Sequence, residues 1–177
     1  MLKESVLKRQ SCRSYSGKKV EKEKLEQIIE VARFAPSARN TQPWKFFCVS
    51  ENDEAVEKVR KAVQPFGVNK FTDNATAFIV IIEQKPWFLL DKIERLKHRD
   101  FVSIDVGITT AHLVLAAEEL GLSTCILGMF NDEKVKEAIN FKKEDMVRLV
   151  VAVGYSSEND FIREKKRKDG TDLVEYL

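Results

Sequence analysis

Apolar residues spaced three and four apart predict amphipathic helices that alternate with short buried strands. One such helix covers residues 21–35, and its apolar face consists of Leu25, Ile28, Ile29 and Ala32. Pro36 ends this helix, because a proline disfavours helical backbone in the residue before it. Two further helices can be capped at their first turns by Asn52 or Asp53 and by Asn131 or Asp132.

Buried strands are expected over residues 45–50, 77–82 and 147–153. The stretch from Ala77 to Ile82 is continuously apolar, which is typical of a strand buried on both faces. Residues 122–129 return the chain to the sheet.

The longest predicted helix runs from Asp100 to Leu120 and is apolar on nearly all sides. Such a helix is usually central and buried, so His112 within it is expected to be a satisfied core histidine. Residues 84–99 are expected to form a loop or a short helix. Together these elements predict an α+β or α/β sandwich, and residues 1–177 suit a single domain.

Composition and charge exclude several classes of protein. The chain has a net charge of only +2, so no whole-protein basic field points to nucleic acid. Three cysteines without a Cys-x-x-Cys spacing and two histidines without ligand spacing favour neither a disulfide framework nor a metal site. Residues 101–117 carry Asp105 and His112 and fall short of a membrane span, and residues 1–5 lack a signal-peptide core. We therefore expect a cytoplasmic protein without a metal or a membrane segment.

Two basic residues and a hydroxyl near the N-terminus are candidates for binding a phosphate. Arg9, Ser11 and Arg13 stand on alternate positions and share one face if the segment is extended. Guanidinium groups suit a phosphate because they form charge-assisted, bidentate hydrogen bonds. The alternative is a solvated N-terminal stretch. The run of cations at 165–168 allows the same two interpretations, a solvated face or a group that closes on a phosphate.

The polar loop at residues 36–44 is a second candidate. Its polar side chains belong to Ser37, Arg39, Asn40, Thr41 and Gln42, and they can hydrogen-bond either their own turn or a polar ligand. Trp44, which closes the loop, is better explained as a core anchor.

A third candidate is the segment 122–128. Gly128 would let backbone approach a planar ligand closely, whereas Cys125 is interpreted as a small buried side chain rather than a nucleophile. The sequence contains no P-loop and no Gly-x-Gly-x-x-Gly. Asp105 and His112 give only thin support for an acid–base pair.

Four motifs stand in order along the chain: Arg-x-Ser-x-Arg with Tyr15, Pro-Ser-Ala-Arg-Asn-Thr-Gln-Pro-Trp, Gly-Leu-Ser-Thr-Cys-Ile-Leu-Gly, and Val-Gly-Tyr before a basic tail. From end to end the chain resembles the nitroreductase family of FMN-dependent NAD(P)H oxidoreductases, as a small single-domain member. The resemblance implies an α+β three-layer sandwich, with a central mixed β-sheet flanked by helices. It also implies an intertwined homodimer with FMN at the subunit interface. The long apolar helix would form much of that interface, and residues 171–177 would reach across to the partner.

The resemblance further implies the residues of the cofactor site. Arg9, Ser11 and Arg13 would hold the FMN phosphate and ribityl chain, and Lys165 and Arg167 would complete the phosphate site. The other subunit would line the ribityl chain and ring with Pro36, Ser37, Ala38 and Asn40. Leu127 and Gly128 would approach N5 and the ring, while Asn69 and Lys70 match the region at the pyrimidine edge. Ala38 and Leu127 depart from the family pattern, where serine is frequent and some members have glutamate.

The implied activity is the NAD(P)H-dependent reduction of a nitroaromatic, a quinone or a similar flat acceptor by a ping-pong hydride mechanism. No catalytic side chain is required, because the cofactor carries the chemistry. Trp87 and Phe88 are candidates for an aromatic mouth that favours flat acceptors. The alternatives are other flavin chemistry, such as dehalogenation or flavin breakdown, a flavin carrier or sensor without turnover, and a basic-tail module that binds nucleic acid.

Overall fold

A four-stranded antiparallel sheet forms the centre of the protein. The computed structural model describes residues 2–84, 100–142 and 144–177. The strands are β1 (Trp44–Val49), β2 (Ala77–Glu83), β3 (Ser123–Leu127) and β4 (Val147–Gly154), in the order β1-β2-β4-β3. The central strand β2 is buried along nearly its whole length, as its continuous apolar run predicts.

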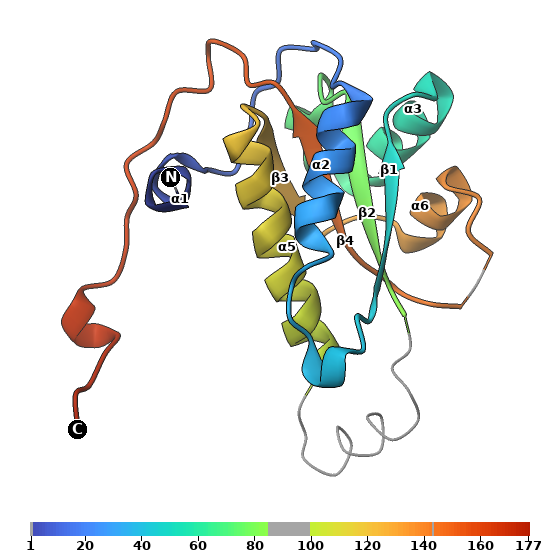
Figure 1. The fold of residues 1–177 in the computed structure, drawn as a ribbon. Helices are drawn as coiled ribbons and strands as arrows, with labels where there is room; N and C mark the ends of the chain where they lie inside the picture. The colour runs from blue at the N-terminus through green and yellow to red at the C-terminus, as the bar shows by residue number, and fades with distance from the viewer. Residues whose placement is uncertain (1, 85–99, 143) are drawn as a thin grey trace.

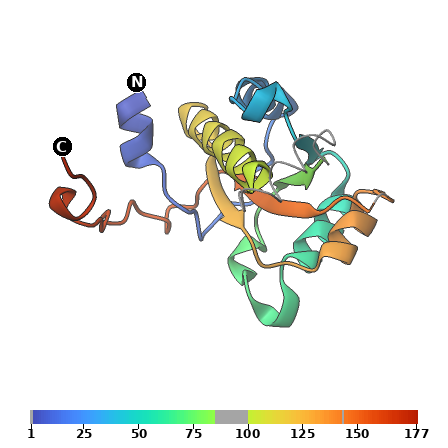
Figure 2. The ribbon, with the colours of Figure 1, turned by 90° about the horizontal axis from the view of Figure 1, so that it is seen from below.

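Helices cover both faces of this sheet (Figures 1 and 2). On one face α2 (Lys22–Ala32) packs against α5 (Phe101–Glu119), and on the other α3 (Asp53–Ala62) packs against α6 (Asp132–Ala138). Each face has its own buried cluster, and neighbours Phe78 and Ile79 on β2 point into different ones, as the two-residue period of a strand requires. The expected α+β three-layer sandwich is therefore confirmed.

The shorter helical elements are α1 (Leu2–Lys8), η1 (Ala38–Asn40), η2 (Pro65–Gly67), η3 (Lys70–Thr72) and η4 (Gly170–Asp172). Of the alternative caps, the asparagines are the ones used. Asn52 accepts a hydrogen bond from the Ala55 backbone N–H, and Asn131 accepts one from Lys134. Helix α2 ends at Ala32, three residues before the predicted end, and the chain tightens into shorter-range backbone bonds as it approaches Pro36.

Two expectations about the sheet need correction. The four strands pair only antiparallel, and the mixed character expected from the resemblance is limited, in the described residues, to an isolated parallel bridge between Ser11 and Thr124. The expected buried strand at 45–50 is β1, an edge strand with an exposed Cys48. An edge strand leaves one side open, so its burial depends on which helices overlie it, which the sequence pattern does not reveal.

Helix α5 is buried on one side only, contrary to the expectation from its composition. Leu113 is fully buried, but Ile104 is 54% exposed, and Gly107 and Ala111 lie on the same exposed side. His112 is half-buried at the margin of this side and so is not the core histidine that we expected. By length and composition α5 could also cross a membrane, again unlike the prediction, but half of that stretch is buried inside the protein against α2 and the sheet.

Both ends of the chain lie to one side of the sandwich (Figure 1). Helix α1 packs beside α5, and the C-terminal segment runs past α1 and away from the body of the molecule. The last residues are apolar and exposed: Leu173, Val174, Tyr176 and Leu177.

Candidate functional site

The segment from Arg9 to Arg13 is extended and lies against the edge strand β3. The Cys12 backbone N–H donates to the Thr124 carbonyl over 2.8 Å, beside the bridge between Ser11 and Thr124. The Cys12 side chain is fully buried, and burial raises the pKa of its thiol to about 12. Since side chains alternate along an extended chain, Arg9, Ser11 and Arg13 share the opposite face, as predicted.

The two guanidinium groups of this face pair with no carboxylate among the residues that the structure describes. Within the described parts of the chain, the guanidinium groups of Arg9 and Arg13 take part in no hydrogen bond or ion pair. Glu118 on α5 is close enough to interact electrostatically with Arg9 and Lys165, but it forms no ion pair with either within the described residues. Two free guanidinium groups on one face therefore leave an excess of positive charge that an anion could neutralise.

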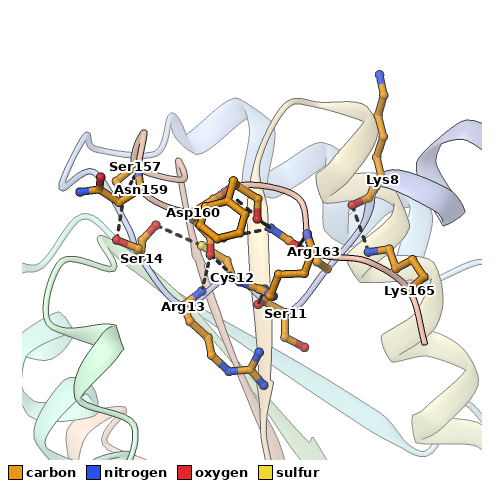
Figure 3. A network of polar contacts seen from close by, with 12 residues as sticks. Lys8, Ser11, Cys12, Arg13, Ser14, Ser157, Asn159, Asp160, Arg163 and Lys165 are labelled. Carbon is orange, nitrogen blue, oxygen red and sulfur yellow. Dashed lines mark hydrogen bonds and ion pairs between the residues drawn. The ribbon is translucent and has the colours of Figure 1, made fainter. Parts of the chain in front are cut away.

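The C-terminal segment brings more positive charge to the same place. The Lys165 ammonium donates to the Arg9 carbonyl over 2.6 Å, which fixes it beside this face (Figure 3 shows it next to Lys8). Burial lowers the pKa of Lys165, and the neighbouring positive charges of Arg9, Arg167 and Arg163 lower it further. A lowered lysine pKa means that the surroundings disfavour the protonated, positively charged form of the side chain. A bound anion would favour that form and raise the pKa again. Arg167 is exposed, and its guanidinium donates to the adjacent Lys166 carbonyl.

The far end of β3 meets the loop that carries Asn69. The Asn69 amide nitrogen donates to the carbonyls of Val63, over 2.8 Å, and Met129, over 3.1 Å. Only its amide oxygen is left for a ligand, while the neighbouring Lys70 is exposed. These two bonds hold the loop beside Gly128. The structure therefore brings together three of the predicted site residues, Asn69, Lys70 and Gly128.

Gly128 and Leu127 differ in what they can offer to a ligand. A Cβ built on Gly128 would meet nothing within 4 Å, so the chain's own packing does not require glycine at this position. Leu127, the last residue of β3, is only 3% exposed because its side chain packs into the core. Only its backbone can therefore face a ligand. The predicted contact at Leu127 is thus restricted to main-chain atoms.

The polar loop that contains η1 forms a rigid turn. The Gln42 backbone N–H donates to the Ser37 hydroxyl over 2.9 Å, and the Gln42 side chain donates to Asn40. Arg39, Asn40 and Gln42 all have positive φ, a conformation that costs free energy in residues other than glycine. Much of the polarity that marked this loop in the sequence therefore stabilises its own turn.

A buried carboxylate anchors this turn. Asp105 on α5 is 4% exposed and accepts a hydrogen bond from the Ala38 backbone N–H over 3.0 Å. Burial raises the pKa of the Asp105 carboxyl, and the bond from Ala38 opposes that rise. Asp105 and His112 are seven residues apart on one helix, about 10 Å along its axis, so they do not form an acid–base pair.

A single chain does not bring all the predicted site residues together. Pro36, Ser37, Ala38 and Asn40 lie at the end of α2 away from the segment 9–13 (Figure 1). The resemblance assigns these four residues to the partner's site, which is consistent with their separation here. The predicted aromatic mouth, Trp87 and Phe88, lies outside the described residues.

Other predicted roles are decided by burial. Trp44 is buried in the core beside α2 and α5, as expected. Cys125 is buried and burial raises the pKa of its thiol, so it is the small core side chain that we predicted rather than a thiolate nucleophile. No cluster of three or more potential metal ligands occurs in residues 2–84, 100–142 and 144–177.

Sequence reasoning missed the structural role of four residues that hold the predicted site residues in place: Gln10, Asp105, Asp160 and Arg163. The one available signal was a charged residue at position 105 within an otherwise apolar helix. The other three are ordinary surface residue types, and only the docking of the C-terminal segment places them together.

Comparisons with known proteins agree with this fold. A sequence model of the nitroreductase family matches residues 6–67 and 63–155, and the chain belongs to this family of oxidoreductases. A protein from Archaeoglobus fulgidus with the provisional name NADH dehydrogenase/NAD(P)H nitroreductase is 30% identical over 161 residues, which cover 88% of this chain and 86% of that one.

Two further relatives carry more specific names. The solved structure of an FMN-dependent nitroreductase from Clostridium difficile is similar, with a TM-score of 0.71 and 29% identity over 97% of this chain and 96% of that one. An iodotyrosine deiodinase from Haliscomenobacter hydrossis is 26% identical over 184 residues, which cover 91% of this chain and 82% of that one.

Proposed function

We propose that this protein is an FMN-dependent oxidoreductase that uses NAD(P)H to reduce nitroaromatic, quinone or similar flat acceptors in a ping-pong cycle. The observation that carries the proposal is the set of cations at Arg9, Arg13 and Lys165. Both guanidinium groups lack a carboxylate partner among the described residues, and burial, followed by neighbouring positive charge, lowers the pKa of Lys165. Such a set suits a phosphate that carries about two negative charges.

The residues along β3 fit the remainder of FMN. From Thr124, beside the cations, to Gly128 the strand covers about 13 Å, so a ligand whose phosphate lies at one end can place a ring at the other. The open space over Gly128 accommodates a flat group, and a backbone N–H there can donate to it. The amide oxygen of Asn69 and the ammonium of Lys70 are available at the ring's polar edge.

FMN, when bound, supplies the redox chemistry, taking hydride from a nicotinamide and giving electrons to the acceptor. The chain's contribution is to bind, orient and surround it. Arg9, Ser11, Arg13 and Lys165 would hold the phosphate, with Arg167 at the margin of the site. The backbone at Leu127 and Gly128 would orient the ring, and positive charge from Lys70 would stabilise negative charge at its edge.

The proposal includes a homodimer with two sites. The exposed apolar side of α5, around Ile104, and the apolar C-terminal residues 173–177 are surfaces that a second copy of the chain would cover. The same packing would bring the partner's Pro36, Ser37, Ala38 and Asn40 to the ribityl chain and ring. A cytoplasmic location belongs to the same proposal, since NAD(P)H is the reductant.

The visible spectrum of the freshly purified protein, before and after anaerobic addition of NAD(P)H, tests the proposal. A flavin spectrum that bleaches is the expected result. Bound flavin that does not bleach would contradict turnover and favour a carrier or sensor. A colourless protein that fails to take up added FMN would contradict the flavin site itself.

A second candidate is reductive dehalogenation, which the similarity to iodotyrosine deiodinase favours. The two activities differ in the acceptor. Steady-state NAD(P)H oxidation with a nitroaromatic, a quinone and an iodotyrosine, each under nitrogen, separates them. Release of iodide from iodotyrosine at a rate above those of the other acceptors would overturn the proposed substrate class.

A further inference from the structure

The C-terminal segment is joined to residues 9–13 by three side chains outside the predicted phosphate-binding set: Gln10, Asp160 and Arg163. We refer to these three residues as the clasp. Figure 3 shows Asp160 and Arg163 above Ser11 and Arg13, where the two segments lie side by side. The clasp residues come from positions about 150 apart in the sequence.

The clasp bonds to the main chain of the N-terminal segment and leaves its basic side chains free. Arg163 donates to the Ser11 carbonyl and, over 2.8 Å, to the Asp160 carboxylate. The same Asp160 oxygen lies 3.5 Å from the Arg13 backbone nitrogen, at the limit of a hydrogen bond. Through these contacts the backbone on both sides of Cys12 is held by the C-terminal segment.

Gln10 completes the connection in both directions. Its amide nitrogen donates to the Phe161 carbonyl over 3.0 Å, and its amide oxygen accepts from the Arg163 backbone N–H over 3.0 Å. Because residues alternate along an extended chain, Gln10 faces the C-terminal segment while Arg9 and Ser11 face the other way. One side of this segment thus carries the clasp, and the other carries the cations.

The charges of Asp160 and Arg163 neutralise each other within the clasp, which leaves the guanidinium of Arg13 available to a ligand. The Asp160 side chain is only 4% exposed in its ion pair with Arg163, which neutralises it. The guanidinium of Arg13 extends away from Asp160 in Figure 3 rather than pairing with it. An unneutralised carboxylate in this place would compete with a phosphate for Arg13.

We infer that the clasp positions the phosphate-binding residues and thereby determines the preference for FMN over riboflavin, which lacks the phosphate. The inference rests on the proposed function. Gln10, Asp160 and Arg163 are positioning residues: they fix where Ser11, Arg13 and Lys165 stand, and the phosphate is bound by those residues. Because the clasp lies at the phosphate end, loosening it affects a ligand with a phosphate and spares one without.

The test compares FMN with riboflavin as ligands of the full chain freed of bound flavin, by quenching of flavin fluorescence. Gln10→Met removes the amide bonds without changing any charge, so an altered FMN affinity reports position alone. We expect about tenfold weaker FMN binding, as for the loss of one or two well-placed hydrogen bonds, with riboflavin affinity unchanged within about twofold. Arg163→Lys keeps the charge but loses the planar fork, and it should lower FMN affinity in the same selective way.

Arg60→Lys is the matched control. Arg60 makes the same kinds of bond elsewhere, donating to the carbonyls of Thr72 and Ala75 and pairing with Glu57. Its loss should leave the ratio of FMN to riboflavin affinity unchanged, and thermal unfolding of each variant shows whether the fold persists.

The outcomes separate the inference from the function on which it rests. A wild-type chain that binds FMN no better than riboflavin would contradict the phosphate site, and with it the proposed function. A wild-type preference for FMN that Gln10→Met and Arg163→Lys both retain would overturn the clasp alone. Equal loss of both ligands in these variants would also overturn it, since that reports general damage rather than positioning.

Discussion

The cations near the N-terminus and the polar turn after α2 attracted attention in the sequence for the same reason, a density of polar side chains. In the structure they are opposites. Arg9 and Arg13 have no ionic partner within the described residues, whereas the turn at 37–42 bonds to itself and to the buried Asp105. In the described residues, no carboxylate forms an ion pair with either guanidinium group of the first region, which is therefore available to an anion. The second is already satisfied and contributes a rigid shape.

The difference shows which parts of the predicted site a single chain brings together. The cations and the end of β3 lie on one chain and can be evaluated there. The turn has three residues with positive φ and an anchor on α5, yet it lies at the end of α2 away from the segment 9–13 of its own chain. Backbone strain held by a buried anchor is typical of functional loops, so the turn makes sense if it acts on a second copy.

The largest expected effect would come from separating the two copies of the proposed homodimer. Ile104→Glu places a charge on the exposed apolar side of α5, where the single chain tolerates it because the side chain is 54% exposed. If this side packs against a second copy, the variant becomes monomeric by light scattering and loses both FMN and riboflavin. Ile104→Val is the matched control and should remain dimeric. A dimeric Ile104→Glu protein with normal flavin binding would assign the turn to some role within its own chain.

A smaller and more selective effect is expected at the cations. Arg9→Ala combined with Arg13→Ala removes the charge-assisted bonds to a phosphate, which should weaken FMN binding by about 3 kcal/mol, or two orders of magnitude in Kd. Riboflavin binding should change little, because it has no phosphate. Fluorescence titration with both ligands measures this difference. Unchanged FMN affinity would contradict the assignment of this region.

The smallest effect concerns the anchor of the turn and depends on pH. Burial raises the pKa of Asp105 in the folded protein, so the fold loses stability as the pH rises from the unfolded-state pKa, about 4, through the raised folded-state value. Asp105→Asn keeps an oxygen that can accept from Ala38 and does not titrate. The wild type should therefore lose unfolding free energy relative to Asp105→Asn over that rise in pH. Urea unfolding of both proteins at several pH values measures it, and a difference that does not vary with pH would contradict the role of burial.

Local pattern predicted most of the secondary structure. The apolar run of β2 and the spacing of apolar residues in α2 each depend on neighbours within a few residues, so the sequence determines them. The sequence also located the capped first turns of α3 and α6, although it left each cap open between an asparagine and an aspartate. The motifs also predicted the correct family, and they singled out Gly128 and the alternate positions of Arg9, Ser11 and Arg13 as candidates for the site.

Which side chains are buried could be learned only from the tertiary structure. The composition of α5 does not reveal that one side stays open in a single chain, nor does the apolar run of β1 reveal that it is an edge strand. Leu127 and Cys125 are likewise assigned to the core only by what covers them. These properties depend on elements far away in the chain.

The sequence by itself thus determined which elements form, which family the protein belongs to and which side chains carry the candidate chemistry, because local spacing and residue type are sufficient for these. Only the tertiary structure decided which of those side chains are free. Arg13 is available because Asp160 pairs with Arg163, and the polar side chains of the turn are not, because they bond to one another. Whether a polar group can bind a ligand depends on its partners in space, and the contacts that decide this join residues up to about 150 positions apart.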